Sequence, residues 1–229
     1  MFPRRRRSAP LIAVLAALLV AAWFAASYQH QRIELLPLDE ALVVPQSVPT
    51  QQARVARVID GDTVELADGR TVRYVGIDAP ERGQPFYDYA TQLNKMLVLG
   101  KTVGLFPDKL SEDHYGRELC YVIDLETRVL VNGEMIRHGA AHVYTVPPNV
   151  LYHEELTALQ RAARNERRGL WSQFREGNES GYVASRRGYV FHRPSCADVH
   201  SISPGNRVEF ASRGEAFDRG LSPCRDCDP

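Results

Sequence analysis

The stretch "RVARVIDGDTVELADGRTVRYVGI", Arg54–Ile77, decides the fold. Apolar and polar residues alternate along it, which is the pattern of half-buried strands. The pair Asp68-Gly69 interrupts the alternation, and such a pair between two alternating runs is typical of a tight hairpin. The stretch therefore predicts three short antiparallel strands in quick succession.

Strand and helix patterns continue beyond this stretch. Alternation or helical spacing predicts a helix, two strands and two helices, in the order Tyr87–Leu99, Thr102–Phe106, Leu119–Ile123, Val131–His138 and Leu151–Arg167. Five strands with interspersed helices fit an α+β fold, a small, partly open barrel of the OB type with packed helices. We expect this domain to span residues 52–173.

Charge is balanced over the 229 residues, with 28 Lys and Arg against 28 Asp and Glu. Four of the arginines, Arg4–Arg7, stand at the N-terminus, and without them the balance is 24 against 28. A slightly acidic domain does not favour broad adhesion to nucleic acid, which requires a basic face. Local basic pockets stay compatible with this composition.

The first 28 residues have the pattern of a membrane-targeting segment. An arginine run precedes the uncharged apolar stretch Ala9–Ala26, which is short for a spanning helix and long for the core of a signal peptide. We expect a membrane anchor with the remaining chain outside the cytoplasm; the alternative is a cleaved signal peptide and secretion. Residues 29–51 contain several prolines and are expected to form a spacer.

Two acids separated by one glycine, Asp60-Gly61-Asp62, follow the first predicted strand. Carboxylates two residues apart repel each other unless water screens them or a cation binds there. Asp78 and Glu81 supply two further carboxylates after the third strand. Because a hard cation such as calcium prefers oxygen ligands, these acids form a candidate metal site.

Two arginines accompany the acids, Arg73 in "TVRYVGIDAPE" and Arg117 in "DHYGREL". A guanidinium matches phosphate oxygens in a bidentate manner and keeps its charge. Carboxylates, a metal and two arginines together indicate phosphodiester hydrolysis. Arg73 and Asp78 point to opposite faces of a regular strand, so we expect a bend or bulge at Gly76 between them.

Residues 52–173 resemble the staphylococcal nuclease family, the thermonuclease-like domain. The resemblance rests on "IDGDTV", the R-x4-D-x-P-E block from Arg73 to Glu81, "YGR" at Tyr115–Arg117, and "RRGLWS" near the end. It implies an OB-fold barrel with the activity of a calcium-dependent nuclease that hydrolyses phosphodiester bonds of DNA, RNA or both with little sequence specificity.

The resemblance also implies roles for single residues. Calcium is bound by the carboxylates of Asp62 and Asp78 and by the main-chain carbonyl of Ala79. The implied catalytic residues are Glu81, as general base, and the transition-state-stabilising Arg73 and Arg117. The implied substrate-binding residues are Tyr115, His114 and His142; the family's type sequence has a lysine at the second of these positions and a tyrosine near the third.

Metal-ligand residue types recur near the C-terminus as His192, Cys196, Cys224 and Cys227. The spacing, His-x3-Cys and Cys-x2-Cys, gives two pairs that can each hold one side of a tetrahedral ion. After a linker at residues 174–181, residues 182–229 are too few for a comfortable core. We expect structural zinc; the alternative is a disulfide between Cys196 and either of the other cysteines.

This segment resembles the zinc-binding module of bacterial Ada methyl-acceptor proteins, in which four cysteines hold the ion. Here His192 takes the place of the first cysteine. A histidine ligates zinc but does not accept a methyl group as a thiolate does. The resemblance therefore implies a structural or binding module.

Two functions of different classes are compatible with the sequence. The first is the nuclease, and the second is a non-catalytic OB-type nucleic-acid- or protein-binding module tethered to the membrane, because such barrels persist without chemistry. A decayed site is expected to have lost at least one functional residue. The presence of the whole set favours the enzyme: Asp62, Arg73, Asp78, Glu81 and Arg117.

Overall fold

The structure is a computed structural model, and it describes residues 33–48, 50–177, 179 and 181–229. The contacts divide the chain into Met1–Glu34 and one compact unit, Leu35–Pro229. The predicted targeting segment, residues 1–28, lies outside the described residues. None of the helices in the described ranges combines the length and the apolar character that crossing a membrane requires.

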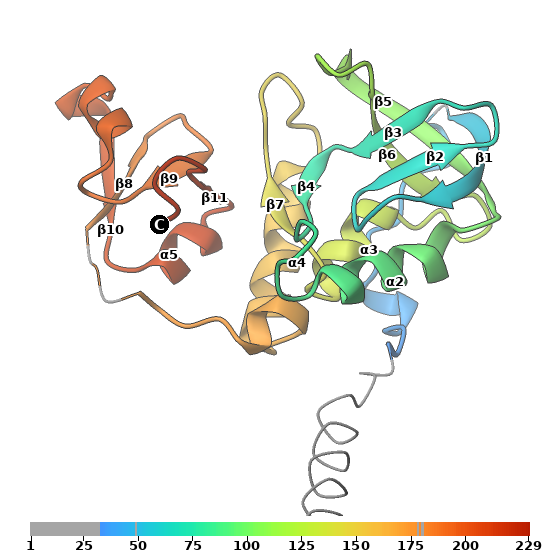
Figure 1. Cartoon of the computed structure of the whole chain (residues 1–229), viewed down its shortest axis with the longest axis horizontal. Helices are drawn as coiled ribbons and strands as arrows, with labels where there is room; N and C mark the ends of the chain where they lie inside the picture. Colours follow the sequence, from blue (N-terminus) through green and yellow to red (C-terminus); the bar gives the residue numbers. More distant parts are fainter. Residues whose placement is uncertain (1–32, 49, 178, 180) are drawn as a thin grey trace, which may run out of the picture. The chain divides into compact units, whose positions relative to one another are not determined.

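Five strands form a closed barrel in the order β1-β2-β3-β6-β5 (Figure 1). Their bounds are Gln51–Val58 for β1, Thr63–Leu66 for β2, Thr71–Tyr74 for β3, Thr102–Glu112 for β5 and Glu118–Asp124 for β6. β1 closes the barrel because its C-terminal half pairs with β2 and its N-terminal half with β5. The predicted five-stranded barrel is confirmed, but it is closed, where a partly open one was expected.

The hairpin between β2 and β3 lies where Asp68-Gly69 predicted it. Gly69 has a φ of 90°, a conformation that glycine adopts without strain. The Leu66 amide donates to the carbonyl of Arg70 at 2.8 Å, which closes the turn. Alternate residues of both strands are buried in the barrel: Val64, Leu66, Val72 and Tyr74.

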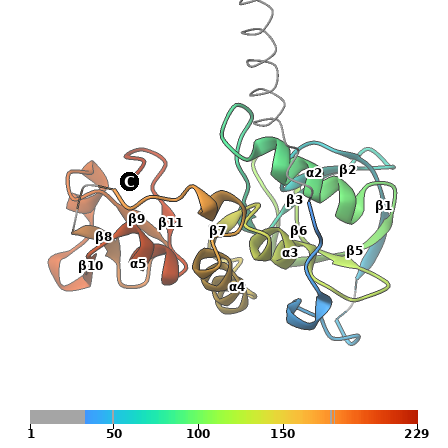
Figure 2. The same cartoon turned by 90° about the horizontal axis from the view of Figure 1, so that it is seen from below.

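Three helices pack on the barrel or beside it, with bounds Tyr87–Val98 for α2, Val131–Arg137 for α3 and His153–Asn165 for α4. α2 and α3 lie side by side along the barrel in both views (Figures 1 and 2). All three helices were predicted: α2 and α3 begin at the predicted residue and end one residue earlier, and α4 is two residues shorter at each end.

Gly76 begins a short strand, β4, Gly76–Asp78, which one residue separates from the end of β3. Its φ is 80°, and a Cβ at this position would lie 2.8 Å from Cδ1 of Leu156. The chain leaves the barrel here, and β4 pairs with β7, His142–Tyr144, in a separate two-stranded sheet. The bend expected at Gly76 is confirmed, whereas β7 was not predicted.

The C-terminal residues form a four-stranded sheet with one helix, drawn in orange and red in Figure 1. The order is β10-β8-β9-β11, and the bounds are Tyr182–Ser185 for β8, Val190–His192 for β9, Arg207–Phe210 for β10, Arg213–Asp218 for α5 and Ser222–Pro223 for β11. Its buried cluster includes Phe191 and Phe217 but also Ala163 of α4 and Trp171. The sheet therefore shares its core with the segment that follows the barrel.

Residues ahead of β1 also pack on the barrel. The side chain of Arg128 donates to the carbonyl of Pro45 at 2.8 Å, and Arg137 donates to the carbonyl of Pro37 at 2.8 Å. Both arginines are buried. Ordered packing thus begins before β1, in residues that were expected to form a spacer.

Candidate active site

The acid pair lies in the loop between β1 and β2, and the glycine between the acids is packed tightly. A Cβ at Gly61 would lie 2.6 Å from the Cβ of Ala79 and 2.7 Å from the Cβ of Ala90. Contacts this short do not occur between real side chains, so a larger residue forces the loop away from α2 and from the end of β4. Gly61 thereby brings Asp60 and Asp62 against both elements.

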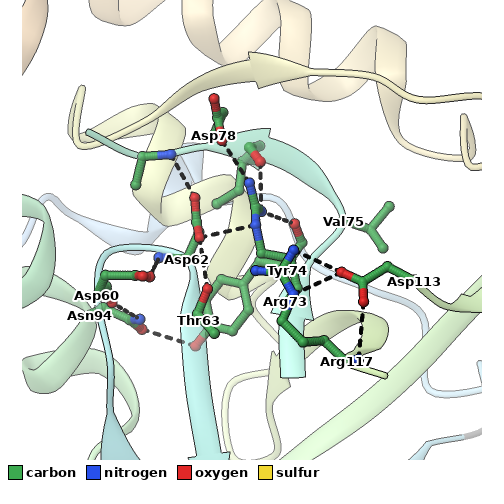
Figure 3. A network of polar contacts seen from close by, with 12 residues as sticks. Asp60, Asp62, Thr63, Arg73, Tyr74, Val75, Asp78, Asn94, Asp113 and Arg117 are labelled. Atoms are coloured by element: carbon green, nitrogen blue, oxygen red, sulfur yellow. Dashed lines mark hydrogen bonds and ion pairs between the residues drawn. The ribbon is translucent and has the colours of Figure 1, made fainter. Parts of the chain in front are cut away.

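Asn94 of α2 connects the same loop to Tyr74 of the barrel strand β3. Its fully buried amide donates to the carbonyl of Asp60 at 2.9 Å and accepts a hydrogen bond from the Tyr74 hydroxyl at 2.9 Å (Figure 3). The backbone N–H of Asp62 in turn donates to Oδ1 of Asp60 at 3.1 Å. The loop is therefore held by hydrogen bonds on both sides of the glycine.

Asp62 is a buried carboxylate, 5% exposed. Its Oδ2 accepts a 2.6 Å hydrogen bond from the Ala79 amide, and its Oδ1 accepts one of 3.0 Å from the Thr63 hydroxyl. Burial raises the pKa of Asp62 well above its ordinary value, and Arg73 counteracts the rise without cancelling it. The neighbouring Asp60 and Asp78 raise the pKa further.

Arg73 stands between Asp62 and Asp78 (Figure 3). Its Nε lies 3.1 Å from Oδ1 of Asp62, and its Nη2 donates to Oδ1 of Asp78 at 2.7 Å. Nη1 donates to the carbonyls of Tyr74 and Ile77, at 2.6 and 2.8 Å, across the bend at Gly76. The bend therefore lets one side chain join both acids.

These residues fit a calcium ion by their chemistry. Two partly or fully buried carboxylates face one common cation, the guanidinium of Arg73, so the space between them suits positive charge. Burial is the main cause of the raised pKa of Asp62, and Arg73 offsets only part of it. Oxygen ligands are those that calcium prefers, and the adjacent Ala79 lies within hydrogen-bond reach of Asp62.

Arg117 directly precedes β6. β6 pairs in parallel with β3, and Arg73 of β3 lies opposite Leu119 in this register. The Nε of Arg117 donates to Oδ2 of Asp113 at 2.7 Å. Burial alone raises the pKa of Asp113, but the hydrogen bonds from Arg117 and Tyr115 outweigh it and hold the pKa below its usual value. Asp113 therefore stays charged and orients the arginine.

The other predicted site residues near these strands are more exposed. Glu81 is exposed in the loop between β4 and α2, where its backbone N–H donates to the side chain of Gln84 at 2.7 Å. Tyr115 is 73% exposed, with the guanidinium of Arg117 5.4 Å from its ring centroid. His114 is exposed with its ring 3.8 Å from that of Tyr115.

His142 lies apart from the exposed pair His114 and Tyr115. It stands opposite Asp78 in the register of β4 and β7, and its ring packs edge-on against Phe217 of α5 at 6.2 Å. Burial lowers its pKa, with Asp78 acting in the opposite direction. The role predicted for His142 in substrate binding stays a prediction.

The predicted zinc ligands come together at the other end of the chain. One ligand atom from each of His192, Cys196, Cys224 and Cys227 lies within 4.8 Å of the others. All three cysteines are free thiols in this structure, so the alternative disulfide is not formed. The backbone N–H of Arg193 donates to Sγ of Cys227 at 3.4 Å, which suits a sulfur that carries negative charge on a metal. The donor set fits a tetrahedral zinc ion.

Sequence reasoning missed three residues at the acidic site. Asn94 is hidden among the buried positions of a helix, and Asp113 shows its role only through the spacing of four to Arg117. The third is Arg225, whose Nη2 donates to Oδ2 of Asp78 at 3.0 Å. Arg225 lies inside the Cys-x2-Cys motif, which indicates a metal site, but nothing in the sequence indicates its contact with Asp78.

Comparison with known proteins extends these observations. A sequence model described as "Staphylococcal nuclease homologue" matches residues 71–173. The chain is 43% identical over 124 residues to an uncharacterized endonuclease of Escherichia coli O157:H7, covering 52% of this chain and 76% of that protein. It is 32% identical over 131 residues to the thermonuclease of Staphylococcus hyicus, covering 53% and 76%. Endonuclease YhcR of Bacillus subtilis (strain 168) is 29% identical over 236 residues, covering 84% of this chain and 19% of that protein.

Proposed function

Because this chain belongs to the staphylococcal nuclease homologues and is a nuclease hydrolase, we propose that its activity depends on calcium and that it cleaves DNA, RNA or both with little sequence specificity. The observation that carries the proposal is the pair of the buried Asp62 and the partly buried Asp78, joined through one guanidinium. Burying a carboxylate is costly to a fold unless a cation or hydrogen bonds compensate it.

Calcium would be held by Asp62, Asp78 and the carbonyl of Ala79. When bound, it supplies positive charge for the phosphate oxygens of the substrate. The chain's own part is to fix these ligands: Gly61 and Asn94 hold the loop, and the Ala79 amide orients Asp62.

Glu81 is the proposed general base. It is exposed in the loop between β4 and α2, three residues after Asp78, so it is open to water and close in sequence to the proposed metal ligands. A carboxylate in this place takes a proton from the water that attacks phosphorus.

Arg73 and Arg117 are the proposed phosphate-binding groups. Each is already oriented by a carboxylate, Arg73 by Asp78 and Arg117 by Asp113. Oriented guanidinium groups stabilise the negative charge that develops on phosphate oxygens in the transition state. Because contacts to phosphate carry no base information, such a site supports cleavage with little sequence specificity.

We propose structural zinc for the cluster of His192, Cys196, Cys224 and Cys227, and membrane attachment through residues 1–28 with the nuclease outside the cytoplasm. The first is supported by the converging ligand atoms. The second is supported by the sequence pattern alone, and cell fractionation of the full chain with and without residues 1–28 tests it.

The nuclease proposal is tested with purified protein and with single-stranded DNA, double-stranded DNA and RNA of mixed sequence. We expect cleavage with calcium, loss of cleavage after chelation, and recovery when calcium alone is added back. Equal cleavage in chelator contradicts the proposed metal, and cleavage confined to one short sequence contradicts the low specificity.

A further inference from the structure

Arg225 reaches the acidic site from the C-terminal sheet. It lies between Cys224 and Cys227, two residues after β11, and its Nη2 donates to Oδ2 of Asp78 at 3.0 Å. Its guanidinium also lies 4.9 Å from the ring centroid of Tyr144 on β7. Arg73 occupies the other oxygen of the same carboxylate. Asp78 is therefore held between two arginines, one 5 and the other 147 residues away in sequence.

The backbone that carries Arg225 is fixed on both sides. β11 pairs with β9 in parallel, and the Cys224 amide donates to the carbonyl of Phe191 at 2.9 Å. The fully buried Ser222 donates its hydroxyl hydrogen to the carbonyl of Val143 on β7 at 3.0 Å. Since β7 pairs with β4, which ends at Asp78, a continuous set of strands positions the arginine.

The ion pair is not needed to attach the C-terminal sheet. The attachment already includes a buried hydrogen bond of 2.7 Å from Gln160 to the carbonyl of Phe217, and the aromatic packing of Phe217 on Trp171. The side chain of Arg225 is 64% exposed. Ion pairs with this exposure contribute little to stability, so the position of the arginine calls for another role.

The guanidinium of Arg225 contacts a proposed calcium ligand, Asp78, directly. An exposed guanidinium there has donors left for a ligand, since one hydrogen bond to Asp78 uses one of five N–H groups.

We propose that Arg225 is a substrate-binding residue of the nuclease site, which binds a phosphate oxygen of the nucleic acid from the loop between Cys224 and Cys227. The inference rests on the proposed function, because it takes a phosphodiester as the ligand. It adds a third arginine to Arg73 and Arg117 and makes the C-terminal sheet part of the active site. Guanidinium groups bind phosphate in a bidentate manner, which suits this place.

The inference predicts how Arg225→Ala behaves in the full chain. We expect kcat/KM for a mixed-sequence single-stranded DNA oligonucleotide to fall about 10- to 100-fold, mostly through KM, as expected for loss of a charge-assisted hydrogen bond. Arg225→Lys should recover part of the loss. The matched control is Arg187→Ala, which removes the same charge from an exposed turn of the same sheet and should leave kcat/KM unchanged.

A binding measurement separates this inference from the proposed function. In a Glu81→Gln background, fluorescence anisotropy should show weaker binding of the labelled oligonucleotide when Arg225 is also replaced by alanine, whether or not the wild type cleaves. Failure of the wild type to cleave with calcium contradicts the proposed function alone. Unchanged binding and unchanged kcat/KM in Arg225→Ala overturn the inference. Higher activity of Arg225→Ala also overturns the inference, because the arginine would then limit the function of Asp78 and would not bind substrate.

The zinc loop gives a further test of the same inference. His192→Ala, which removes a proposed zinc ligand, should lower kcat/KM by about as much as Arg225→Ala, and the double variant should lose no more than either. His192→Cys keeps four ligands and should restore the activity. If the losses in kcat/KM of His192→Ala and Arg225→Ala add fully in the double variant, the zinc ligand does not act through Arg225, which contradicts the inference.

Discussion

At the scale of single residues, Gly61 connects the fold to the chemistry. A side chain here would meet Ala79 and Ala90 at distances below 3 Å. We expect Gly61→Ala to lower the free energy of unfolding by about 1 to 3 kcal/mol, the usual cost of overpacking, and to lower activity by displacing Asp62. Chemical denaturation and initial cleavage rates measure the two effects.

The matched control for this variant is Gly205→Ala. A Cβ at Gly205 meets no atom within 4 Å, and its φ is not in the left-handed region. Stability and activity should stay near those of the wild type. Similar losses in both variants would show that glycine replacement itself, and not the contact with Ala79 and Ala90, causes the effect.

Replacing Glu81 should lower mainly kcat, whereas replacing Asp62 should weaken calcium binding. Glu81→Gln removes a base and should lower kcat by roughly 100- to 10,000-fold while calcium binding persists. Asp62→Asn removes a metal ligand and should weaken calcium binding itself. Isothermal titration calorimetry with calcium, beside kcat, distinguishes them. Near wild-type turnover of Glu81→Gln would assign the activation of water to another group.

The same residues show what the sequence predicts and what it leaves out. The bend at Gly76 was predictable because Arg73 and Asp78 lie close in sequence and their side-chain directions follow from strand geometry. Arg225 was not predictable, since it lies 147 residues from Asp78 and depends on how two sheets pack. The partner of Arg117, Asp113, belongs to a turn whose hydrogen bonds become visible only in the structure.

At the scale of elements, the C-terminal sheet depends on the helical segment before it. Phe217 packs edge-on against Trp171, Phe174 and Phe191 at 5.1 to 5.8 Å. From the sequence, residues 182–229 are too few for a core of their own, and zinc was expected to stabilise them. In the structure, their hydrophobic core also includes Trp171 and Ala163 from outside that range.

This shared core predicts a large effect of Phe217→Ala. Removing the ring should cost about 3 to 5 kcal/mol in the free energy of unfolding. Trp171 is one of two tryptophans, and the other, Trp23, lies in the N-terminal segment, so fluorescence of the chain from residue 33 onward reports on this cluster. Leu151→Ala is the control: this leucine is 49% exposed, and its loss should change stability by about 0.5 kcal/mol or less.

Zinc should act on a smaller region than the whole sheet. A second buried cluster contains Cys196 and Cys224 together with Val183 and Val199. We expect one zinc per chain by elemental analysis. Because structural zinc supplies about 10 kcal/mol or more in isolated peptides, its removal should speed amide hydrogen exchange around these ligands. His192→Ala should do the same. A metal-free chain with slow exchange at these amides contradicts the zinc site.

Element types were more predictable than element partners. The hairpin at Asp68-Gly69 and the amphipathic α4 depend on local pattern, and both form as predicted. β7 is three residues long, too short for alternation to indicate a strand. The packing of the residues before β1 depends on the buried Arg128 and Arg137. Their carbonyl partners lie 83 and 100 positions away in sequence, so no local pattern indicates these contacts.

At the scale of the whole molecule, the barrel and the C-terminal sheet both contribute to one acidic site. The loop between β1 and β2 supplies Asp62, β4 supplies Asp78, β3 of the barrel supplies Arg73, and the C-terminal sheet supplies Arg225. In the proposed enzyme, the metal ligands lie at the ends of strands, and Arg225 would add a phosphate contact from the loop between Cys224 and Cys227. Above all, we propose that the buried Asp62 and the partly buried Asp78 hold the metal on which cleavage depends.

The most direct test of that claim is the cleavage rate as a function of calcium concentration, measured for the wild type and for Asp62→Asn. We expect a saturating curve for the wild type with no cleavage at zero calcium. In the variant, the calcium concentration at half-maximal rate should rise about tenfold or more, since even an outer partner of a metal ligand has effects of this size. Cleavage that does not depend on calcium, or the same half-maximal concentration in both proteins, contradicts a metal held by Asp62.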